Sequence, residues 1–297
     1  MPKITCYMCA LLVILCCFAS AYGADVRVRA PQSLVDVTHG YYISLLQLAL
    51  DKTADEYGVA TVVVTDFNVT QGRALTELAR EQDSRIDVDW AATSLRREQD
   101  LLPVRVPLLG GLLGYRVPVI RVDSVGDFSA IRAIGDLRHY KAVQGMHWPD
   151  SDILEFAGIP VERVPLFESM YAMLKEGRSD FFPRGIAEAY AEVEETGGGA
   201  LVVFDALLIQ YPMPMYFFTS HLRPKLAVRL EKGLRAAIHD GSFSRLFRSH
   251  PATAPLFPLS RFVGSRVIHL ENPNLPPTTL LGDSSLWISV GGPLRPH

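Results

Sequence analysis

The sequence predicts an α/β protein of two lobes, with the second lobe inserted into the first. Between residues 26 and 93, strand-like apolar runs alternate with amphipathic helical runs in the order βαβαβ. The same alternation restarts after the glycine-rich segment 108–121. This order is typical of a covered, largely parallel sheet. Its repetition predicts two such units within the 297-residue chain.

The first unit opens with residues 26–30, whose alternating apolar and basic side chains predict a strand. Residues 41–58 predict a helix, because leucine and alanine recur at helical spacing and Gly58 follows as a C-terminal cap. The remaining elements predicted for this unit are a buried strand at 60–65, an amphipathic helix at 72–84 and a strand at 86–93.

The second unit is expected between residues 119 and 211. Its apolar runs predict strands at 141–145, 179–183 and 200–209, and residues 214–220 predict the strand that returns to the first lobe. Its helical runs lie at 149–158, 167–177 and 186–199.

After the second unit, residues 225–241 place leucine and isoleucine four apart on one helical face and end at Asp240 and Gly241. This helix is expected to pack on one of the lobes. The proline-rich remainder predicts an extended tail pinned by Trp287. The predicted division is therefore a signal peptide at 1–23, lobe 1 at 24–118 and 212–250, lobe 2 at 119–211, and the tail at 251–297.

The N-terminus predicts a cleaved secretory signal. Lys3 precedes an apolar run of about 13 residues, and the small residues Ala21 and Gly23 suit signal peptidase. That run is shorter than the about 20 residues of a membrane-spanning helix. All four cysteines lie inside the signal, so the exported chain is expected to lack disulfides and thiol chemistry. We therefore expect a periplasmic protein.

Composition and motifs exclude several classes of function. The net charge of −3 gives no reason to expect nucleic acid as a partner. The eight histidines form no HExxH pair and no metal-ligand spacing, and the chain has no P-loop, no GxGxxG and no GxSxG elbow. The sequence therefore predicts no metal, no cofactor and no catalytic residues.

Polar residues instead follow the predicted strands, where α/β units bind ligands. Thr93, Ser94 and the arginines Arg96 and Arg97 follow the strand at 86–93. Trp148, Asp150 and Ser151 open a helix after the strand at 141–145, where backbone amides can hold an anion. The remaining candidates are Arg184 after the strand at 179–183, and Gln32 and Tyr41 after the first strand.

Each candidate also has a purely structural interpretation. Asp150 or Ser151 can cap its helix, and Trp148 and Tyr41 can be core residues. Either Arg96 or Arg97 can be the one that faces the cleft. Arg184 can contact a ligand or can form a salt bridge with a lobe-one or helix carboxylate.

The order of these features resembles the extracytoplasmic solute-binding proteins of family 3, which have the type-2 periplasmic-binding fold. Ser94-Leu95-Arg96-Arg97 is similar to the T-x-x-R motif of that family, "EGRSDFF" at 176–182 to its GR-x-D strand, and the helix at 225–241 to its final helix. The resemblance covers about residues 25–250. It implies two lobes that close on a small solute bound in the cleft between them.

The resemblance also implies roles for individual residues. Arg97 would grip the ligand carboxylate with Ser94 as the hydroxyl, and Thr93 with Arg96 is the shifted alternative. Amides around Trp148 to Ser151 would complete that site. The family places an ammonium-accepting aspartate about five residues after the position of Asp180, where this chain has Gly185 beside Arg184. An ordinary α-amino acid is therefore a questionable ligand.

The predicted function is that of a monomeric, non-enzymatic periplasmic protein. It would close on a small polar, carboxylate-bearing solute, an amino acid or a related compound, and would present it to the membrane permease of an ABC-type importer. Closure would bend hinge strands near 113–119 and 211–216. One alternative is a sensor that reports the ligand to a membrane receptor. Another is a hydrolase that uses His147 with Asp150 or Asp152.

Overall fold

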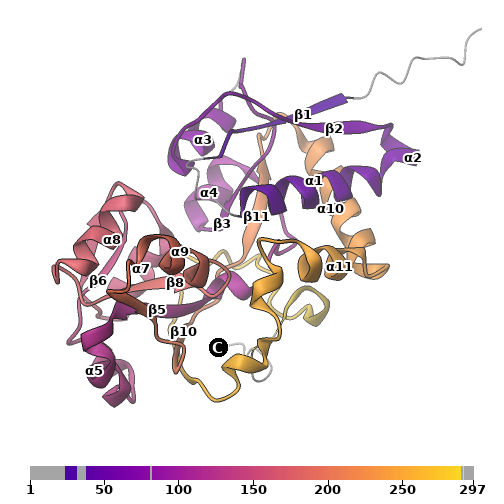
Figure 1. Ribbon diagram of the computed structural model, residues 1–297. Helices are drawn as coiled ribbons and strands as arrows, with labels where there is room; N and C mark the ends of the chain where they lie inside the picture. Colours follow the sequence, from indigo (N-terminus) through magenta and orange to yellow (C-terminus); the bar gives the residue numbers. More distant parts are fainter. Residues whose placement is uncertain (1–23, 32–37, 81, 289, 291–297) are drawn as a thin grey trace, which may run out of the picture.

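The computed structural model describes residues 24–31, 38–80, 82–288 and 290, which form two lobes joined by extended crossing segments (Figure 1). The predicted two-lobed α/β fold is confirmed. The predicted signal peptide at 1–23, with its four cysteines, and the site candidate Gln32 lie outside the described residues.

The first lobe is built on two small sheets. β1 (Ala24–Val28) and β2 (Ala60–Val64) pair in parallel. β11 (Met215–Thr219) lies between β3 (Asp89–Ala92) and β4 (Leu102–Val104) and is antiparallel to both. The helices of this lobe are α1 (His39–Asp51), α2 (Ala54–Tyr57), α3 (Gln71–Leu78), α4 (Leu95–Asp100), α10 (Pro224–His239) and α11 (Ser242–Ser249).

The second lobe is built on one seven-stranded sheet. Its order is β12-β10-β5-β8-β6-β7, and β9 pairs with β5. The strands are β5 (Tyr115–Arg121), β6 (Ala142–Gly145), β7 (Val161–Val164), β8 (Phe181–Gly185), β9 (Leu201–Val203), β10 (Leu207–Gln210) and β12 (Arg266–His269). The helices are α5 (Val125–Ala130), α6 (Ile134–Leu137), α7 (Pro149–Phe156), α8 (Phe167–Lys175) and α9 (Ala189–Thr196). The predicted boundaries at 119 and 211 stay a prediction.

Two elements of the first lobe differ from the sequence prediction. β2 was expected to be buried, but its Val63 and Val64 are exposed. Among the described residues, β2 pairs with β1 alone, in a two-stranded sheet. The helix predicted over 41–58 is broken between α1 and α2. At the break, the Thr53 hydroxyl donates to the carbonyls of Ala49 and Leu50 and accepts a hydrogen bond from Arg229 Nε on α10.

The strand predicted over 179–183 is also displaced. β8 includes Arg184 and Gly185, so Arg184 does not follow the strand but lies within it. Pro183 has no N–H to give to a sheet. β6 pairs with β8 at Phe181, so Pro183 lies outside that pairing. At Pro183 the side chain of Gln144 on β6 instead donates to the carbonyl at 3.0 Å.

The segment 251–297 is more than the extended tail that was expected. Within it, β12 pairs in parallel with β10 and so becomes a strand of the second-lobe sheet. Short 3₁₀ turns flank it at Ala254–Leu256, Leu259–Phe262 and Ser284–Leu286. β12 has four residues, which are too few to show the periodicity of a strand in the sequence. Its pairing with β10 is therefore seen only in the structure.

The core of the first lobe depends on a close helix contact. The predicted final helix is α10, and its Leu230 and Leu234 are buried where α10 packs against α1. Gly233 lies so near α1 that a Cβ on it would stand 2.0 Å from the Ala49 carbonyl oxygen. Only glycine permits this approach.

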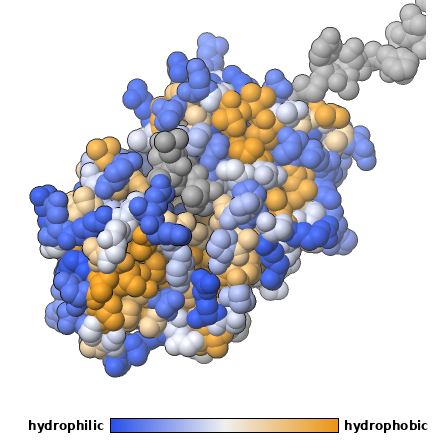
Figure 2. All heavy atoms as spheres, viewed as in Figure 1, coloured by the Kyte–Doolittle hydropathy of each residue, from blue (hydrophilic) through white to orange (hydrophobic). Residues whose placement is uncertain are grey.

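Figure 2 shows separate apolar patches on both lobes, while hydrophilic side chains cover much of the remaining visible face. Among the described residues, no helix has both the length and the apolar character needed to cross a bilayer.

We expect Gly233→Ala to lower the free energy of unfolding by about 1–3 kcal/mol, because the added methyl group pushes α10 away from α1. Urea denaturation followed by circular dichroism measures this loss. Gly72→Ala on α3 is the matched control, because open space surrounds Gly72 and the expected change is a slight gain in stability. Equal midpoints for the two variants would contradict the close contact.

Candidate functional site

A cavity of about 750 Å³ opens between the two lobes. Both lobes supply its walls, as expected for a cleft that closes on a ligand. Its charged lining residues are Arg29, Arg97, Arg116, Asp150, Glu168, Arg184, Glu188 and Glu192, and its aromatic ones are Tyr42, Trp90, Trp148 and Phe167, together with His147.

Arg97 is the lobe-one arginine of this cavity. Ser94 caps α4 by accepting a hydrogen bond from the Arg97 amide at 3.3 Å, and this turn aims the Arg97 side chain inward. Its guanidinium donates to Ala92 O at 2.5 Å and to Gln71 Oε1 at 3.1 Å. Both acceptors are neutral, and Arg97 has no carboxylate ion-pair partner among the described residues.

Burial lowers the pKa of the Arg97 guanidinium to about 10, although the charges of Asp150 and Asp89 act in the opposite direction. Arg97 therefore remains a cation at neutral pH. A half-buried cation held only by neutral acceptors gains most from an added anion.

The lobe-one candidates Arg96, Thr93 and Tyr41 do not line the cavity. Arg96 points to solvent, with a side chain that is 89% exposed, and pairs with Asp100. The structure therefore places Arg97, not Arg96, in the cleft. Thr93 is buried and its hydroxyl donates to Glu98 Oε1 at 2.7 Å. Tyr41 is also buried and donates to the Leu108 carbonyl at 2.7 Å.

On lobe two, Trp148 and Asp150 line the cavity and Ser151 does not. Trp148 is the N-cap residue of α7, and its ring stacks on Phe182. The Ser151 hydroxyl is used within the fold, where it donates to Gly145 O at 2.8 Å. The amides of Trp148 and Ser151 donate to Gly145 O and Trp148 O, and Pro149 has no N–H. These three positions therefore offer no amide to an anion.

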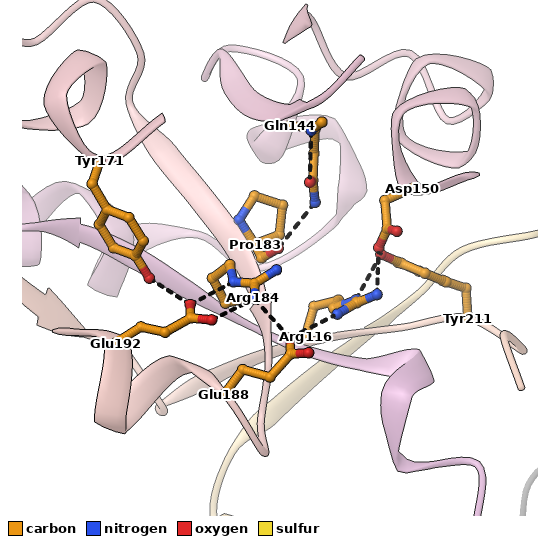
Figure 3. Close-up of polar contacts among 10 residues, drawn as sticks. Arg116, Gln144, Asp150, Tyr171, Pro183, Arg184, Glu188, Glu192 and Tyr211 are labelled. Carbon is orange, nitrogen blue, oxygen red and sulfur yellow. Dashed lines mark hydrogen bonds and ion pairs between the residues drawn. The ribbon is translucent and has the colours of Figure 1, made fainter. Parts of the chain in front are cut away.

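Asp150 is engaged from two sides. Arg116 Nη2 on β5 lies 2.7 Å from Asp150 Oδ1, and the hydroxyl of Tyr211 donates to the same oxygen. All three side chains are buried. Asp150 thus ties α7 to β5 and to the segment that returns to lobe one, and its contacts are structural (Figure 3).

Arg184 belongs to a second buried ion pair. Its Nε and Nη2 donate to the two carboxylate oxygens of Glu192 on α9 at 2.7 and 2.6 Å, and Tyr171 donates to the same carboxylate (Figure 3). The guanidinium also lies over the rings of Trp148 and Phe182. Of the two interpretations of Arg184, the structure shows the salt bridge to a helix carboxylate.

Glu188 lies between both arginines. Its Oε2 is 2.9 Å from Arg184 Nη2 and 3.9 Å from Arg116 Nη1, yet this buried oxygen accepts no hydrogen bond within the described part of the chain. Burial raises the pKa of the Glu188 carboxyl, and the charge of Arg184 limits that rise. Burial alone would lower the pKa of Arg184, but the charges of Glu188 and Glu192 outweigh it and raise the pKa.

Sequence reasoning missed Arg116, Glu188, Glu192 and Tyr211. Glu188 and Glu192 lie four apart at the start of the helix that follows Arg184, which puts both carboxylates on one helix face, and this spacing was a usable signal. Arg116 precedes the apolar run 117–120 of β5, which was a second signal. Tyr211 gave none, because its hydroxyl meets Asp150 only through tertiary contact.

The proposed hydrolase pairing finds no support in this geometry. Asp150 is held by Arg116 and Tyr211, and Asp152 by Arg163. Neither aspartate is hydrogen-bonded to His147 in the described structure. The described residues also hold no cluster of three or more side chains suited to a metal ion.

Comparison with known proteins agrees with the fold. No family model matches the sequence, and no curated protein does. Among solved structures, an ancestral arginine-binding protein bound to arginine is similar at 17% identity and a TM-score of 0.56, over 76% of this chain and 97% of that one. A lysine-complexed putative ABC-transporter binding component from Wolinella succinogenes has 15% identity and a TM-score of 0.54, over 76% and 94%.

A histidine kinase sensor domain is also similar, at 14% identity and a TM-score of 0.54, over 76% of this chain and 94% of that one. At these identities the likeness concerns the fold alone. The chain therefore has the two-lobed fold of type-2 periplasmic binding proteins, and about a quarter of its residues lie outside the matched region.

We expect Arg184→Ala to lower the free energy of unfolding by about 3–5 kcal/mol, because it leaves Glu192 buried without its counter-charge. The double variant Arg184→Met with Glu192→Gln removes both charges and keeps an acceptor for Tyr171, so it should recover much of that loss. Urea denaturation measures both variants. The control is Arg96→Ala, which should change stability by about 0.5 kcal/mol or less. Matching values for Arg184→Ala and Arg96→Ala would refute the structural ion pair.

Proposed function

We propose that this protein is a periplasmic solute-binding protein whose lobes close on a small carboxylate-bearing solute. The observation that carries the proposal is Arg97, a cation in the interlobe cavity that has hydrogen-bond partners but no carboxylate partner among the described residues. A ligand carboxylate would supply the missing anion through the paired N–H groups of the guanidinium. Residue Ser94 supports this role indirectly, because it caps α4 and so orients Arg97.

The charges of the cavity favour a zwitterion. Arg116 is matched by Asp150, and Arg184 is matched by Glu192. Arg97 on lobe one has no carboxylate partner among the described residues, and on lobe two the carboxylates of Glu188 and Glu192 share Arg184. A solute with a carboxylate and a cationic group would complement both, so we infer an amino acid or a related compound as the ligand.

Glu188 also accounts for the glycine at 185. A Cβ on Gly185 would stand 2.8 Å from Glu188 Oε2 and 3.0 Å from Arg116 Nη1, so a side chain there would displace the Glu188 carboxylate. The resemblance to family 3 places the ammonium-accepting aspartate at this point of the chain. We infer that the Glu188 carboxylate occupies the space of that missing side chain and accepts the cationic group of the ligand.

The energetics are adequate for a receptor. A hydrogen bond to a charged group contributes roughly 1.5–3 kcal/mol, so Arg97 and Glu188 together would provide a large part of the about −8 kcal/mol of a micromolar complex. The aromatic wall of Tyr42, Trp90, Trp148 and Phe167 would supply the rest by burying the ligand's carbon atoms.

The output we propose is delivery to the permease of an ABC-type importer, with the protein acting as a non-enzymatic monomer exported through its signal peptide. The likeness to a binding component of an ABC transporter supports this output. The likeness to a histidine kinase sensor domain supports the second candidate, a ligand sensor. Loss of solute uptake on gene deletion supports import, and loss of a transcriptional response with normal uptake supports sensing.

We expect amino acids or related zwitterions to raise the melting temperature of the protein in a screen that also includes dicarboxylates, sugars and peptides. A ligand at 100 times its dissociation constant adds about 2.7 kcal/mol of stability. Arg97→Met should weaken binding about 10- to 150-fold, which corresponds to the loss of one charged hydrogen bond. Arg96→Ala, on the solvent side of α4, should bind normally. If neutral sugars alone stabilise the protein, the proposal fails.

We also expect affinity for a zwitterion to fall as the pH is lowered. The pKa of Glu188 is raised by burial, and a bound cation favours the ionised form, so binding releases a proton and strengthens as pH rises through that raised pKa. Isothermal titration calorimetry between pH 4 and pH 8 measures the trend. Glu188→Gln should weaken binding and flatten the profile. An unaltered profile in Glu188→Gln would exclude Glu188 as the acceptor.

A further inference from the structure

A segment at the C-terminal end of the chain crosses from one lobe to the other. We call residues 272–283 the C-terminal strap. It follows β12, which belongs to the second-lobe sheet. At its start, Asn272 is buried and its side chain donates to the Pro212 carbonyl at 2.8 Å, in the segment that joins β10 to β11. The strap therefore begins at the crossing between the lobes.

Asn274 then makes contact with both lobes. Its carbonyl accepts the amide of Leu95, the first residue of α4 in lobe one, at 3.0 Å. Its side-chain Nδ2 donates to Asp152 Oδ2 in the first turn of α7 in lobe two, also at 3.0 Å. The Asn272 side chain fixes this geometry, because its Oδ1 accepts the Asn274 amide at 3.0 Å.

The rest of the strap is attached to lobe one and to the crossing strands. Thr278 donates to Glu98 on α4 at 3.4 Å, and Asp283 pairs with Arg235 on α10 at 3.6 Å. Beyond the strap, the indole of Trp287 lies over Gly111 and its Nε1 donates to the Leu280 carbonyl. The strap is thus held at both ends, with Asn274 between the lobes.

We propose that Asn274 is a positioning residue that clamps the start of α4 to the start of α7 and so sets the separation of the two lobes before a ligand arrives. The proposal rests on the proposed function, because α4 carries Arg97 and α7 carries Trp148, two residues that face the interlobe cavity. Asn274 lines no part of that cavity itself. It acts through the two helices that it joins.

The mechanical reason is the number of connections. Two-lobed binding proteins bend at a few hinge positions, and each added tie biases the equilibrium between open and closed arrangements. The strap is a further connection between the lobes, in addition to the two chain segments that contain β5 and β10–β11. The carbonyl bond to Leu95 also satisfies one of the amides that a helix start leaves without an intrahelical partner. Breaking the hydrogen bond between Asn274 and Asp152 therefore weakens the attachment of lobe two to the strap. It also makes the Leu95 amide in lobe one more accessible to solvent.

The test measures this coupling in the full chain without ligand. Asp152→Ala removes the lobe-two partner of Asn274, and Asn274→Asp places two carboxylates together. Hydrogen exchange at the Leu95 amide should quicken about fivefold in both variants, the equivalent of one net hydrogen bond. The radius of gyration from small-angle X-ray scattering should rise in Asn274→Asp. The exchanged pair, Asp152→Asn with Asn274→Asp, restores a hydrogen bond and should return both readouts toward the unsubstituted protein.

Two controls separate the clamp from a general loss of stability. Glu271→Gln changes an exposed neighbour of the strap and should leave Leu95 exchange unchanged. The Val117 amide in β5 reports on the core and should keep its protection in every variant. The proposal is overturned by unchanged Leu95 exchange, by an equal rise at Val117, by an unchanged radius of gyration in Asn274→Asp, or by failure of the exchanged pair to rescue. Because no ligand is present, these results leave the proposed ligand site untouched.

Discussion

The pairing of two buried arginines with carboxylates is the constraint on which the second lobe and its cavity wall depend. Arg116 and Arg184 lie on the neighbouring strands β5 and β8, one register position apart, where like charges repel unless each is compensated. Asp150 on α7 compensates the first, and Glu192 on α9 compensates the second. Removing such charges from water costs several kcal/mol per ion, which good geometry and further hydrogen bonds offset. The two helices are therefore held to the sheet by electrostatics as well as by apolar packing.

This compensation decides which charges are left for a ligand. Because Asp150 and Glu192 are each held by an arginine and a tyrosine, they are used within the fold. Arg97 lacks a carboxylate partner in the part of the chain that the structure describes, and Glu188 has to share Arg184 with Glu192. Arg184 lines the cavity while it is paired within the fold. It holds Glu192 in place and shares Glu188, and its guanidinium supports the ring of Trp148 from within the lobe.

The C-terminal segment adds a structural feature to a fold otherwise explained by two α/β units. β12 extends the second-lobe sheet, and the strap then passes to α4 of the first lobe. In a two-lobed protein, the cavity exists only while the lobes keep the right separation, so contacts remote from the ligand can govern affinity. Asn274 is such a contact. Its two hydrogen bonds join the helices that carry Arg97 and Trp148, the facing walls of the cavity.

The sequence by itself determined the two α/β units and the order of most helices and strands, and it offered Arg97 beside Arg96 as a cavity candidate. Hydrophobic periodicity and caps are local signals, and the Ser94–Arg97 spacing forms a capped helix turn from neighbouring residues alone. Tertiary structure decided the rest. The engagement of Asp150 by Arg116 and Tyr211 and the attachment of β12 join residues that are distant in sequence. The charge of Asp150 gave no local sign of the counter-charge that it meets. Its role is settled only when folding brings the other elements against it.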